Sequence, residues 1–230
     1  MNTYDITVYN YACDLTDSES RNRLFNHIKD AGYRFWCLIN VAGLDYEGGF
    51  FDKAREEIRS IVRLNIEANL EMTHEILKFK DGDKTFRLIN VASMAAYYPI
   101  PVKATYAASK RFLLNFSLAL REEIRDFGGT VTALCPGGMP TTPLVIRSID
   151  AQGFMGRVTT NNVGYVAYET IKRALKGKAV YIPGAANRLL RLLGFIVPQK
   201  VIARVLSSRW KVAHAKSHSL EPATAQSGRL

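Results

Sequence analysis

Ser93, Tyr106 and Lys110 have the residue types and the spacing that proton transfer to a carbonyl oxygen requires. If the segment after Pro101 is helical, Tyr106 and Lys110 lie one turn apart on the same helix face. An unperturbed phenol has a pKa of about 10, and a lysine ammonium within about 4–6 Å favours its ionised form and lowers that pKa. A tyrosine adjusted in this way can exchange a proton with an alcohol or a ketone. The three residues therefore indicate acid/base chemistry at a carbonyl.

The Tyr-x-x-x-Lys spacing is a weak signal by itself, because a chain with 11 tyrosines and many lysines matches it by chance. A solvated helix face would explain the spacing equally well. The neighbouring motifs favour the catalytic interpretation. Asn40, Ser93 and Pro136 each lie at or just past an apolar run that predicts a buried strand. Because ligands of open α/β sheets bind beyond the carboxyl ends of the strands, we expect these motifs to meet in one crevice.

The elements that must position these residues alternate along the chain. Thr16 and Glu19 form a capping box that predicts the start of a helix ending near residue 30. The further helices are predicted at residues 52–79, from the segment after Pro101 to about 127, and at 163–175. Apolar runs predict strands at 6–9, 35–39, 85–91, 130–134 and 179–182. Strands separated by helices of this length indicate an α/β fold with a parallel, doubly wound sheet.

In the order and setting of these motifs, the chain resembles the short-chain dehydrogenase/reductase family over nearly its whole length. The resemblance implies a Rossmann-like fold and hydride transfer between a nicotinamide cofactor and a carbonyl or secondary alcohol. It implies that Ser93 donates a hydrogen bond to the carbonyl oxygen and that Tyr106 exchanges the proton. Lys110 would lower the pKa of the tyrosine and hold the nicotinamide ribose. A cap on the following segment is the alternative role of Ser93.

Asn65 lies inside a long helical pattern and matches the family's helix asparagine. In the family that asparagine binds a water through a backbone distortion and links the lysine to solvent protons. The alternative is a buried asparagine that only needs a polar partner. With Ser93, Tyr106 and Lys110, it completes the expected catalytic set.

The resemblance also implies a set of cofactor-binding residues. Asp14 and Leu15 match the position that contacts the adenine ring, although a turn aspartate near a helix cap is the alternative for Asp14. Thr141 is expected to contact the nicotinamide carboxamide, and Thr142 could take its place. The full set is Asp14, Leu15, Asn40, Ala42, Gly43, Tyr106, Lys110, Pro136, Gly137, Met139 and Thr141.

The family begins with a strand, a glycine-rich turn, a helix and a second strand, and none of them precedes Ile6 here. The fold is thus expected to be truncated at the N-terminus by about two strands. That turn supplies the backbone donors that hold the cofactor pyrophosphate. In the family's strand order the missing strands separate residues 6–9 from the rest of the sheet. We therefore expect Met1 to be an internal methionine of a longer reading frame.

The net charge of +10 is concentrated near the C-terminus. Residues 187–211 mix apolar residues with arginine and lysine, which predicts two amphipathic helices divided at Pro198. These helices could pack on the protein's own surface, pair subunits or lie on an anionic membrane. The extension resembles the branch of the family that acts on acyl chains and steroids, including 3-ketoacyl reductases. This implies a hydrophobic substrate and favours NADPH over NADH.

The length of 230 residues predicts one Rossmann-like domain at 1–186, basic helices at 187–216 and a disordered tail at 217–230. The three cysteines form no Cys-x-x-Cys pair and no histidines cluster, so we expect a cytoplasmic protein without a metal site. No leader and no apolar run of about 18 residues is present. No nucleic-acid recognition motif accompanies the positive charge, so we expect no nucleic-acid partner.

Residues 143–160 occupy the place of the family's substrate lid, and their apolar side chains would suit either an apolar substrate or ordinary helix packing. The helices that hold Asn65 and Tyr106 are expected to form a homodimer interface. Two alternatives to the enzyme remain. One is a non-catalytic homologue that acts as an interaction module, and the other is a protein held on a membrane surface by its C-terminal helices.

Overall fold

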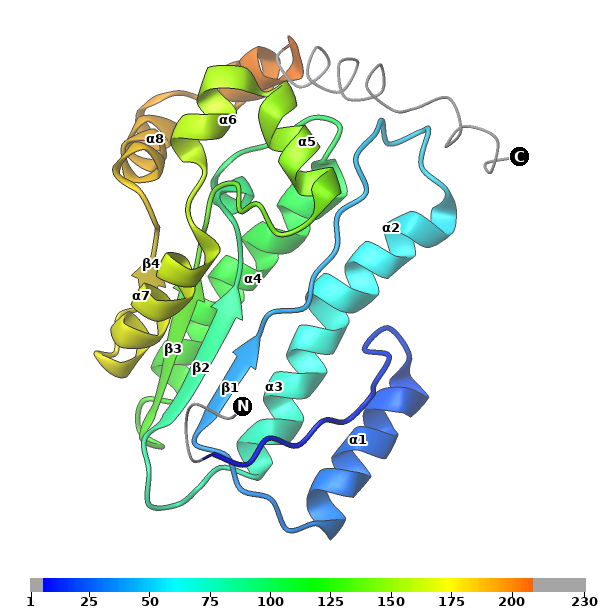
Figure 1. Cartoon of the computed structure of the whole chain (residues 1–230), viewed down its shortest axis with the longest axis vertical. Coiled ribbons are helices and arrows are strands. Elements are labelled where there is room, and N and C mark those ends of the chain that lie inside the picture. Colours follow the sequence, from blue (N-terminus) through cyan, green and yellow to red (C-terminus); the bar gives the residue numbers. More distant parts are fainter. Residues whose placement is uncertain (1–5, 209–230) are drawn as a thin grey trace.

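The computed structural model describes residues 6–208, and a parallel sheet of four strands forms its centre (Figure 1). The strands are β1 (Cys37–Asn40), β2 (Phe86–Val91), β3 (Gly129–Leu134) and β4 (Val180–Tyr181), and they lie in this order. Each pairs in parallel with the next. The prediction of an α/β fold with a parallel sheet is confirmed.

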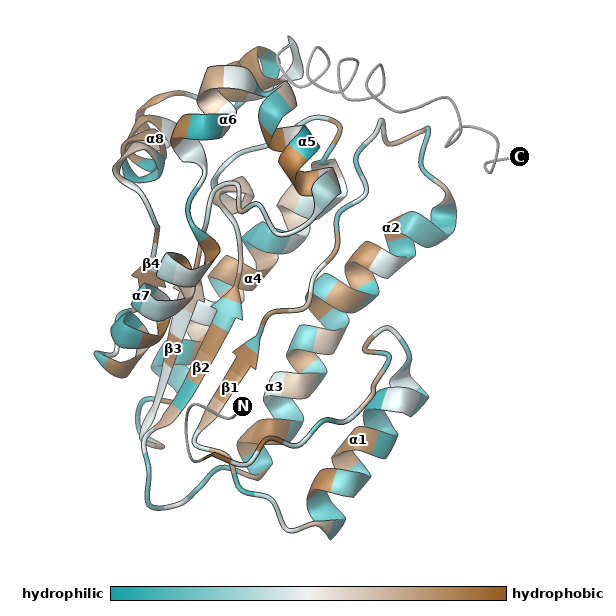
Figure 2. Ribbon diagram, viewed as in Figure 1, coloured by the Kyte–Doolittle hydropathy of each residue, from teal (hydrophilic) through white to brown (hydrophobic). Residues whose placement is uncertain are grey.

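Helices cover both faces of the sheet. Helices α1 (Ser18–Asp30), α3 (Asn69–Lys78) and α4 (Ala104–Glu123) share one apolar core with β2 and β3, which includes Ile28, Ile76 and Ile124. Helix α7 (Val163–Leu175) packs Val166 against Leu134 and Tyr181 in a separate cluster. In Figure 1, α4 lies behind the strands and α7 in front of them. The sheet is therefore doubly wound, as predicted, and in Figure 2 β1 and much of β2 have the brown of hydrophobic residues.

The predicted strand at residues 6–9 is wrong. These residues are extended but join no sheet, and the side chains of Ile6, Val8 and Tyr9 are exposed. A strand needs a neighbour to pair its backbone groups. Within the described residues β1 pairs with β2 alone, so its other edge offers residues 6–9 no register. The apolar pattern of residues 6–9 is present, but the described residues form no strand beside it.

The N-cap of helix α1 lies one residue later in the chain than predicted. Its N-cap is Asp17, whose carboxylate accepts hydrogen bonds from the backbone N–H groups of Glu19 and Ser20. Thr16 instead donates its hydroxyl to Oδ1 of Asp14 at 2.7 Å. The capping box with Thr16 is therefore wrong, because the Asp17 carboxylate reaches the free N–H groups of the first turn.

The long helix predicted at 52–79 is one continuous rod with a π-helical turn inside it. It consists of α2 (Arg55–Val62), the π-helix η1 (Arg63–Ala68) and α3. Arg21 of α1 has a fully buried side chain and pairs with Glu67 and Glu71 of this rod. This pairing ties α1 to the rod. The rod carries Asn65 toward the carboxyl ends of the strands.

The remaining elements follow the prediction with shifted ends. The 3-10 helix η2 (Met94–Tyr97) follows β2, and α4 ends before the predicted 127. Helices α5 (Pro143–Ala151) and α6 (Gly153–Thr159) form the expected lid segment. Helix α8 (Ala185–Ile196) and a helix at 199–208 are separated at Pro198, as the pattern predicts. The expected tail at 217–230 and residues 209–216 of the basic segment lie outside the described residues.

Candidate active site

Ser93 and Tyr106 meet beyond the carboxyl end of β2. Ser93 directly precedes η2, and its side chain accepts a hydrogen bond from the backbone N–H of Ala95 at 3.1 Å. Tyr106 lies in the first turn of α4. The Ser93 side chain lies near the Tyr106 hydroxyl and lowers the pKa of that tyrosine in the way a hydrogen bond does. Ser93 thus caps η2, which was its alternative role, and its hydrogen bond to a carbonyl oxygen stays a prediction.

Lys110 lies on the same face of α4 as Tyr106, as the spacing predicts. Its Nζ is 5.7 Å from the centroid of the tyrosine ring. The ammonium is buried and donates to the backbone carbonyl of Val91 at 2.8 Å. Burial lowers the pKa of Lys110 to about 8. This carbonyl, at the end of β2, fixes the lysine beneath the tyrosine.

The expected lowering of the tyrosine pKa is wrong for this arrangement. Burial raises the pKa of Tyr106 above its ordinary value. The hydrogen bond from Ser93 and the positive charge of Lys103 act in the lowering direction, but desolvation outweighs both. Lys110, which was expected to supply the effect, is engaged with the carbonyl of Val91 instead.

Asn65 is fully buried within the π-helix η1. Its Oδ1 accepts from the Leu44 N–H at 2.9 Å, and its Nδ2 donates to the Leu44 carbonyl at 2.9 Å and to the Ser109 hydroxyl at 3.0 Å. A Cβ at Gly43 would lie 3.0 Å from Lys110 Nζ and 3.2 Å from Asn65 Oδ1. Only a glycine lets the loop after β1 approach both groups this closely. The buried asparagine is fully partnered, and the water link to Lys110 stays a prediction.

Asn40 lies at the predicted place but its side chain faces inward. Its Nδ2 donates to Asn90 Oδ1 at 2.9 Å and to the Thr73 hydroxyl at 3.1 Å. Asn90 in turn donates to the Ser117 hydroxyl at 2.9 Å. These buried groups tie the ends of β1 and β2 to α3 and α4. The side chain of Asn40 therefore supports the crevice, while its backbone borders it.

Leu15, Asn40 and Ala42 line one hollow of about 180 Å³ beside β1. Its walls are largely apolar, with Ile39 and Val41 among them, and such a surface fits a flat aromatic base. Asp14 follows the extended segment just outside this hollow. Hydrogen bonds from Thr16 lower the pKa of its carboxyl. The predicted adenine-side residues thus gather around one place, except that Asp14 forms the turn that was its alternative.

The loop after β3 carries the other predicted cofactor residues. The carbonyl of Pro136 accepts from the Met94 N–H at 2.8 Å, which joins this loop to the one that holds Ser93. A Cβ at Gly137 would collide with the carbonyl of Thr159 at the end of α6. Met139 packs on the cluster of α7 and β4. Close packing against the lid therefore requires glycine at 137.

Thr141 and Thr142 differ in the hydrogen bonds that they form. Thr142 Oγ1 accepts from the backbone N–H of Val145 at 3.3 Å in the first turn of α5. Thr141 is exposed, and its backbone N–H donates to the Met139 carbonyl at 2.8 Å. Because the Thr142 hydroxyl already caps α5, Thr141 is the better candidate for a cofactor contact.

Sequence reasoning missed a cluster of charged residues beside the tyrosine. Lys103 Nζ lies 5.9 Å from the centroid of the Tyr106 ring and 2.6 Å from Asp45 Oδ2, and it also pairs with Glu47. The side chain of Lys103 is only 12% exposed. Burial depresses its pKa, but the two carboxylates outweigh burial and raise it. Burial also raises the pKa of Asp45.

The signal for this cluster was present in the chain but did not stand out. Asp45 follows Gly43 closely and Lys103 precedes Tyr106 closely, so each adjoins a motif. Lys53 supports the same place by donating to the carbonyls of Gly48 and Val102. Val102 has a φ of 61°, which is uncommon for a β-branched residue. The turn at Val102 directly precedes Lys103 on its approach to the tyrosine.

A doubly wound parallel sheet with serine, tyrosine and lysine gathered at its carboxyl edge defines the class of Rossmann-like α/β proteins with an acid/base site. The family model for short chain dehydrogenase matches residues 2–152. The chain therefore belongs to the short-chain dehydrogenase family.

Curated relatives include reductases and a dehydrogenase. The chain is 26% identical over 192 residues to "Ketoacyl reductase HetN" of Nostoc sp., covering 82% of this chain and 67% of the relative. It is 41% identical over 99 residues to "Very-long-chain 3-oxoacyl-CoA reductase" of Laccaria bicolor, covering 42% and 29%. It is 28% identical to "17-beta-hydroxysteroid dehydrogenase type 3" of Mus musculus, covering 68% and 49%. The chain thus spans between under one third and about two thirds of the length of these relatives.

Solved structures share the fold. A 7beta-hydroxysteroid dehydrogenase structure superposes with a TM-score of 0.72 at 20% identity, covering 85% of this chain and 75% of that one. The RhlG/NADP complex of Pseudomonas aeruginosa superposes with a TM-score of 0.62 at 19% identity, covering 75% and 73%. Among the described residues of this chain, no helix combines the length and the apolar character needed to cross a bilayer.

Proposed function

We propose that this protein is an oxidoreductase that transfers a hydride between NAD or NADP and the carbonyl or secondary alcohol of an apolar substrate. The observation that carries this proposal is the meeting of the Ser93 and Tyr106 side chains above the buried ammonium of Lys110, whose Nζ lies 5.7 Å from the centroid of the Tyr106 ring. Carbonyl reduction requires a hydrogen-bond donor and a proton donor at the same carbonyl oxygen. The two hydroxyl groups can both reach one such oxygen.

The residues divide the work of a reduction as follows. When bound in this crevice, a nicotinamide would be the source of the hydride for the carbonyl carbon. Ser93 donates a hydrogen bond to the oxygen as negative charge develops there. Tyr106 gives its phenolic proton to that oxygen, and the product is the alcohol. While Tyr106 is ionised, Lys110 stabilises the transient tyrosinate. A proton from solvent then restores Tyr106 by a route through Asn65 and its predicted water. Oxidation of an alcohol runs through the same steps in reverse.

The residues around the crevice support nicotinamide binding. The hollow beside Leu15 and Ala42 would hold the adenine, Gly43 allows the chain to approach closely, and Thr141 would contact the carboxamide. We favour NADPH because the relatives named as ketoacyl and 3-oxoacyl-CoA reductases work in the reducing direction. The lid helices α5 and α6 present the apolar side chains of Ile146 and Phe154. These residues, and relatives named for acyl and steroid substrates, support an apolar substrate.

We further propose a cytoplasmic homodimer with peripheral membrane contact. On α4, Phe112 and Phe116 stack with ring centroids 6.2 Å apart, and Phe112 and Leu118 are both exposed. Val62 of α2 is exposed as well, and α2 packs beside α4. This apolar face supports pairing of two copies.

Replacing Tyr106 with phenylalanine tests the proposed reaction. The ring and its packing remain, but the proton donor is lost, so kcat for reduction of a 3-ketoacyl thioester should fall by about a hundredfold to ten-thousandfold. Binding of NADPH and NADH, measured by calorimetry, should be unchanged. The Ser93→Ala variant keeps the tyrosine, and its kcat should also be reduced.

Two outcomes would contradict the proposal. Equal activity in the Tyr106→Phe variant would remove the assigned role from the tyrosine. No binding of either nucleotide, by this chain or by a form extended upstream in its reading frame, would support the alternative of a non-catalytic interaction module. The circular dichroism of each preparation confirms that it is folded before either conclusion is drawn.

A further inference from the structure

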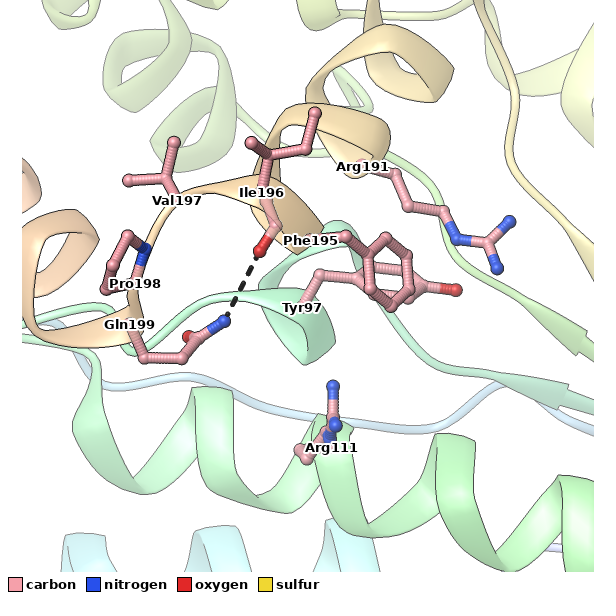
Figure 3. Close-up of a pocket in the computed structure, with 9 residues that line it drawn as sticks. Tyr97, Arg111, Arg191, Phe195, Ile196, Val197, Pro198 and Gln199 are labelled. Carbon is pink, nitrogen blue, oxygen red and sulfur yellow. Dashed lines mark hydrogen bonds between the residues drawn. The ribbon is translucent and has the colours of Figure 1, made fainter.

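A pocket of about 320 Å³ lies between α8, α4 and η2, and Ser93, Tyr106 and Lys110 do not line it. Two arginines reach it from different elements, Arg191 from α8 and Arg111 from α4 (Figure 3). The guanidinium of Arg191 lies 5.4 Å from the ring centroid of Tyr97 and 5.6 Å from that of Phe195. The charges of both arginines act on the Tyr97 hydroxyl. Two cations therefore converge on one aromatic-walled space.

Among the described residues, no carboxylate pairs with the positive charge in this pocket. Within residues 6–208, neither Arg111 nor Arg191 forms an ion pair with a carboxylate. Nε of Arg191 is buried without a hydrogen-bond partner in the same part of the chain. Nη1 of Arg111 donates to the carbonyl of Ala96 at 3.2 Å. A buried donor without an acceptor is costly, and an anion that entered the pocket would satisfy it.

The rim of the pocket is apolar and exposed. Phe195 and Ile196 are 71% and 78% exposed, and Leu192 beside them is 60% exposed. The next helix, 199–208, adds exposed Val201 and Val205. Exposed apolar patches of this kind on a monomer mark interaction sites. The same segment carries Arg188, Lys200 and Arg204 and contains no aspartate or glutamate between residues 185 and 208.

We propose that this pocket binds the phosphate of an anionic phospholipid and docks residues 185–208 on a bilayer surface. The phosphate would lie between Arg111 and Arg191, and Leu192, Phe195 and Ile196 would enter the acyl boundary. A free phosphate would use the arginines but leave the apolar rim in water. A second copy of the chain would bring the same positive charges together, which is unfavourable. The inference deepens the proposed membrane contact and does not depend on hydride transfer.

Vesicle binding by the full chain tests this proposal. Cosedimentation is measured with phosphatidylcholine vesicles and with vesicles that also contain phosphatidic acid, and binding is expected only to the second kind. General attraction to an anionic surface contributes about a factor of five per basic residue, or about twenty-five-fold for two. The double variant Arg111→Gln/Arg191→Gln also loses the hydrogen bonds to the phosphate, so it should bind these vesicles well over about twenty-five-fold more weakly. Its control is Lys200→Gln/Arg204→Gln, which removes the same charge outside the pocket and should lose clearly less.

The remaining measurements separate the occupants. Inorganic phosphate is titrated by calorimetry into the protein without vesicles. An equal loss of vesicle binding in both double variants would mean that binding depends on general charge attraction. That result would overturn the proposal that the pocket binds the lipid phosphate. Phosphate binding without vesicle binding would assign the pocket to a soluble anion, and vesicle-independent self-association lost in Phe195→Ser would assign the face to a second copy. Either result overturns the lipid proposal without bearing on activity, and circular dichroism confirms that each variant is folded.

Discussion

Tyr106 lies between two lysines whose surroundings differ. Lys110 is buried without a carboxylate partner in the described residues, and its pKa falls to about 8. Lys103 pairs with Asp45 and Glu47, and these carboxylates keep it charged. The charge of Asp45 raises the pKa of Tyr106, whereas the charge of Lys103 lowers it. The ion pair therefore adjusts the pKa of Tyr106, which burial raises, through two opposed contributions.

Separating those contributions gives a prediction about pH dependence. Lys103→Met removes a cation beside the phenol, so the pKa of Tyr106 should rise further, and activity in alcohol oxidation should need a higher pH. Asp45→Asn removes an anion, so that pKa should fall and the same activity should extend to lower pH. The measurement is the pH profile of kcat/KM for oxidation in both variants. Apparent pKa values that coincide with wild type in both variants would contradict the argument.

The residues that belong to motifs could be predicted from sequence, and those that depend on loop geometry could not. Ser93, Tyr106, Asn65 and Lys110 come together as the strand and helix pattern indicates. The pair of Asp45 and Lys103 joins positions far apart in the chain, and it forms only because of the loops that precede Lys103 and follow β1. Neither residue carries a local pattern that signals such a contact.

At the scale of elements, the π-helix η1 determines how Asn65 enters the site. Two carbonyls in this turn, those of Leu64 and Asn65, accept hydrogen bonds from Nδ2 of Asn69 at 3.1 Å each. Asn69 is itself buried. A π-helical turn is rare and is frequently found at functional sites. The side chain of Asn69 thus satisfies carbonyls that the irregular turn would otherwise leave with fewer partners.

Replacing Asn69 with leucine should therefore weaken both the fold and the site. The loss of two hydrogen bonds in the interior should reduce the free energy of unfolding by about 1–3 kcal/mol. Activity should fall further than stability explains, because Asn65 shifts relative to Gly43 and Lys110. Urea denaturation and kcat are measured together. His74→Ala changes an exposed residue of the same helix and should alter neither quantity; if it has the same effect as Asn69→Leu, the account of η1 fails.

Elements that depend on residues nearby in the chain are predicted more accurately than elements that depend on distant ones. Helix α7 has the predicted bounds because its cap is local, with Asn162 accepting from the N–H of Tyr165. The strand at 6–9 fails because pairing depends on a distant neighbour. The π-turn is invisible to a periodicity of apolar residues, which continues through it. Sequence therefore predicts where helices and paired strands lie better than their irregularities.

At the scale of the whole molecule, two exposed apolar faces differ in their charges. The face of α8 and the following helix is bordered by cations alone between residues 185 and 208. The face of α2 and α4 has charges of both signs beside it, including the pair of Arg63 and Glu56. A face of mixed charge can meet its own copy without net repulsion. This difference supports the proposals that the first face contacts an anionic surface and that the second pairs two copies.

The proposed dimer can be tested through Phe112 of α4. Phe112→Asp places a charge on each side of the proposed two-fold interface, and the two copies should then repel each other, so the dimer should dissociate to monomers in analytical ultracentrifugation. Phe154→Asp, an equally polar change on the exposed lid helix α6, should leave the dimer intact. Added salt should weaken vesicle binding through α8 but not the dimer, because screening acts on charge and not on apolar burial. A wild-type chain that sediments as a monomer would overturn the proposed dimer, and dimer loss in Phe154→Asp alone would place the interface at α6.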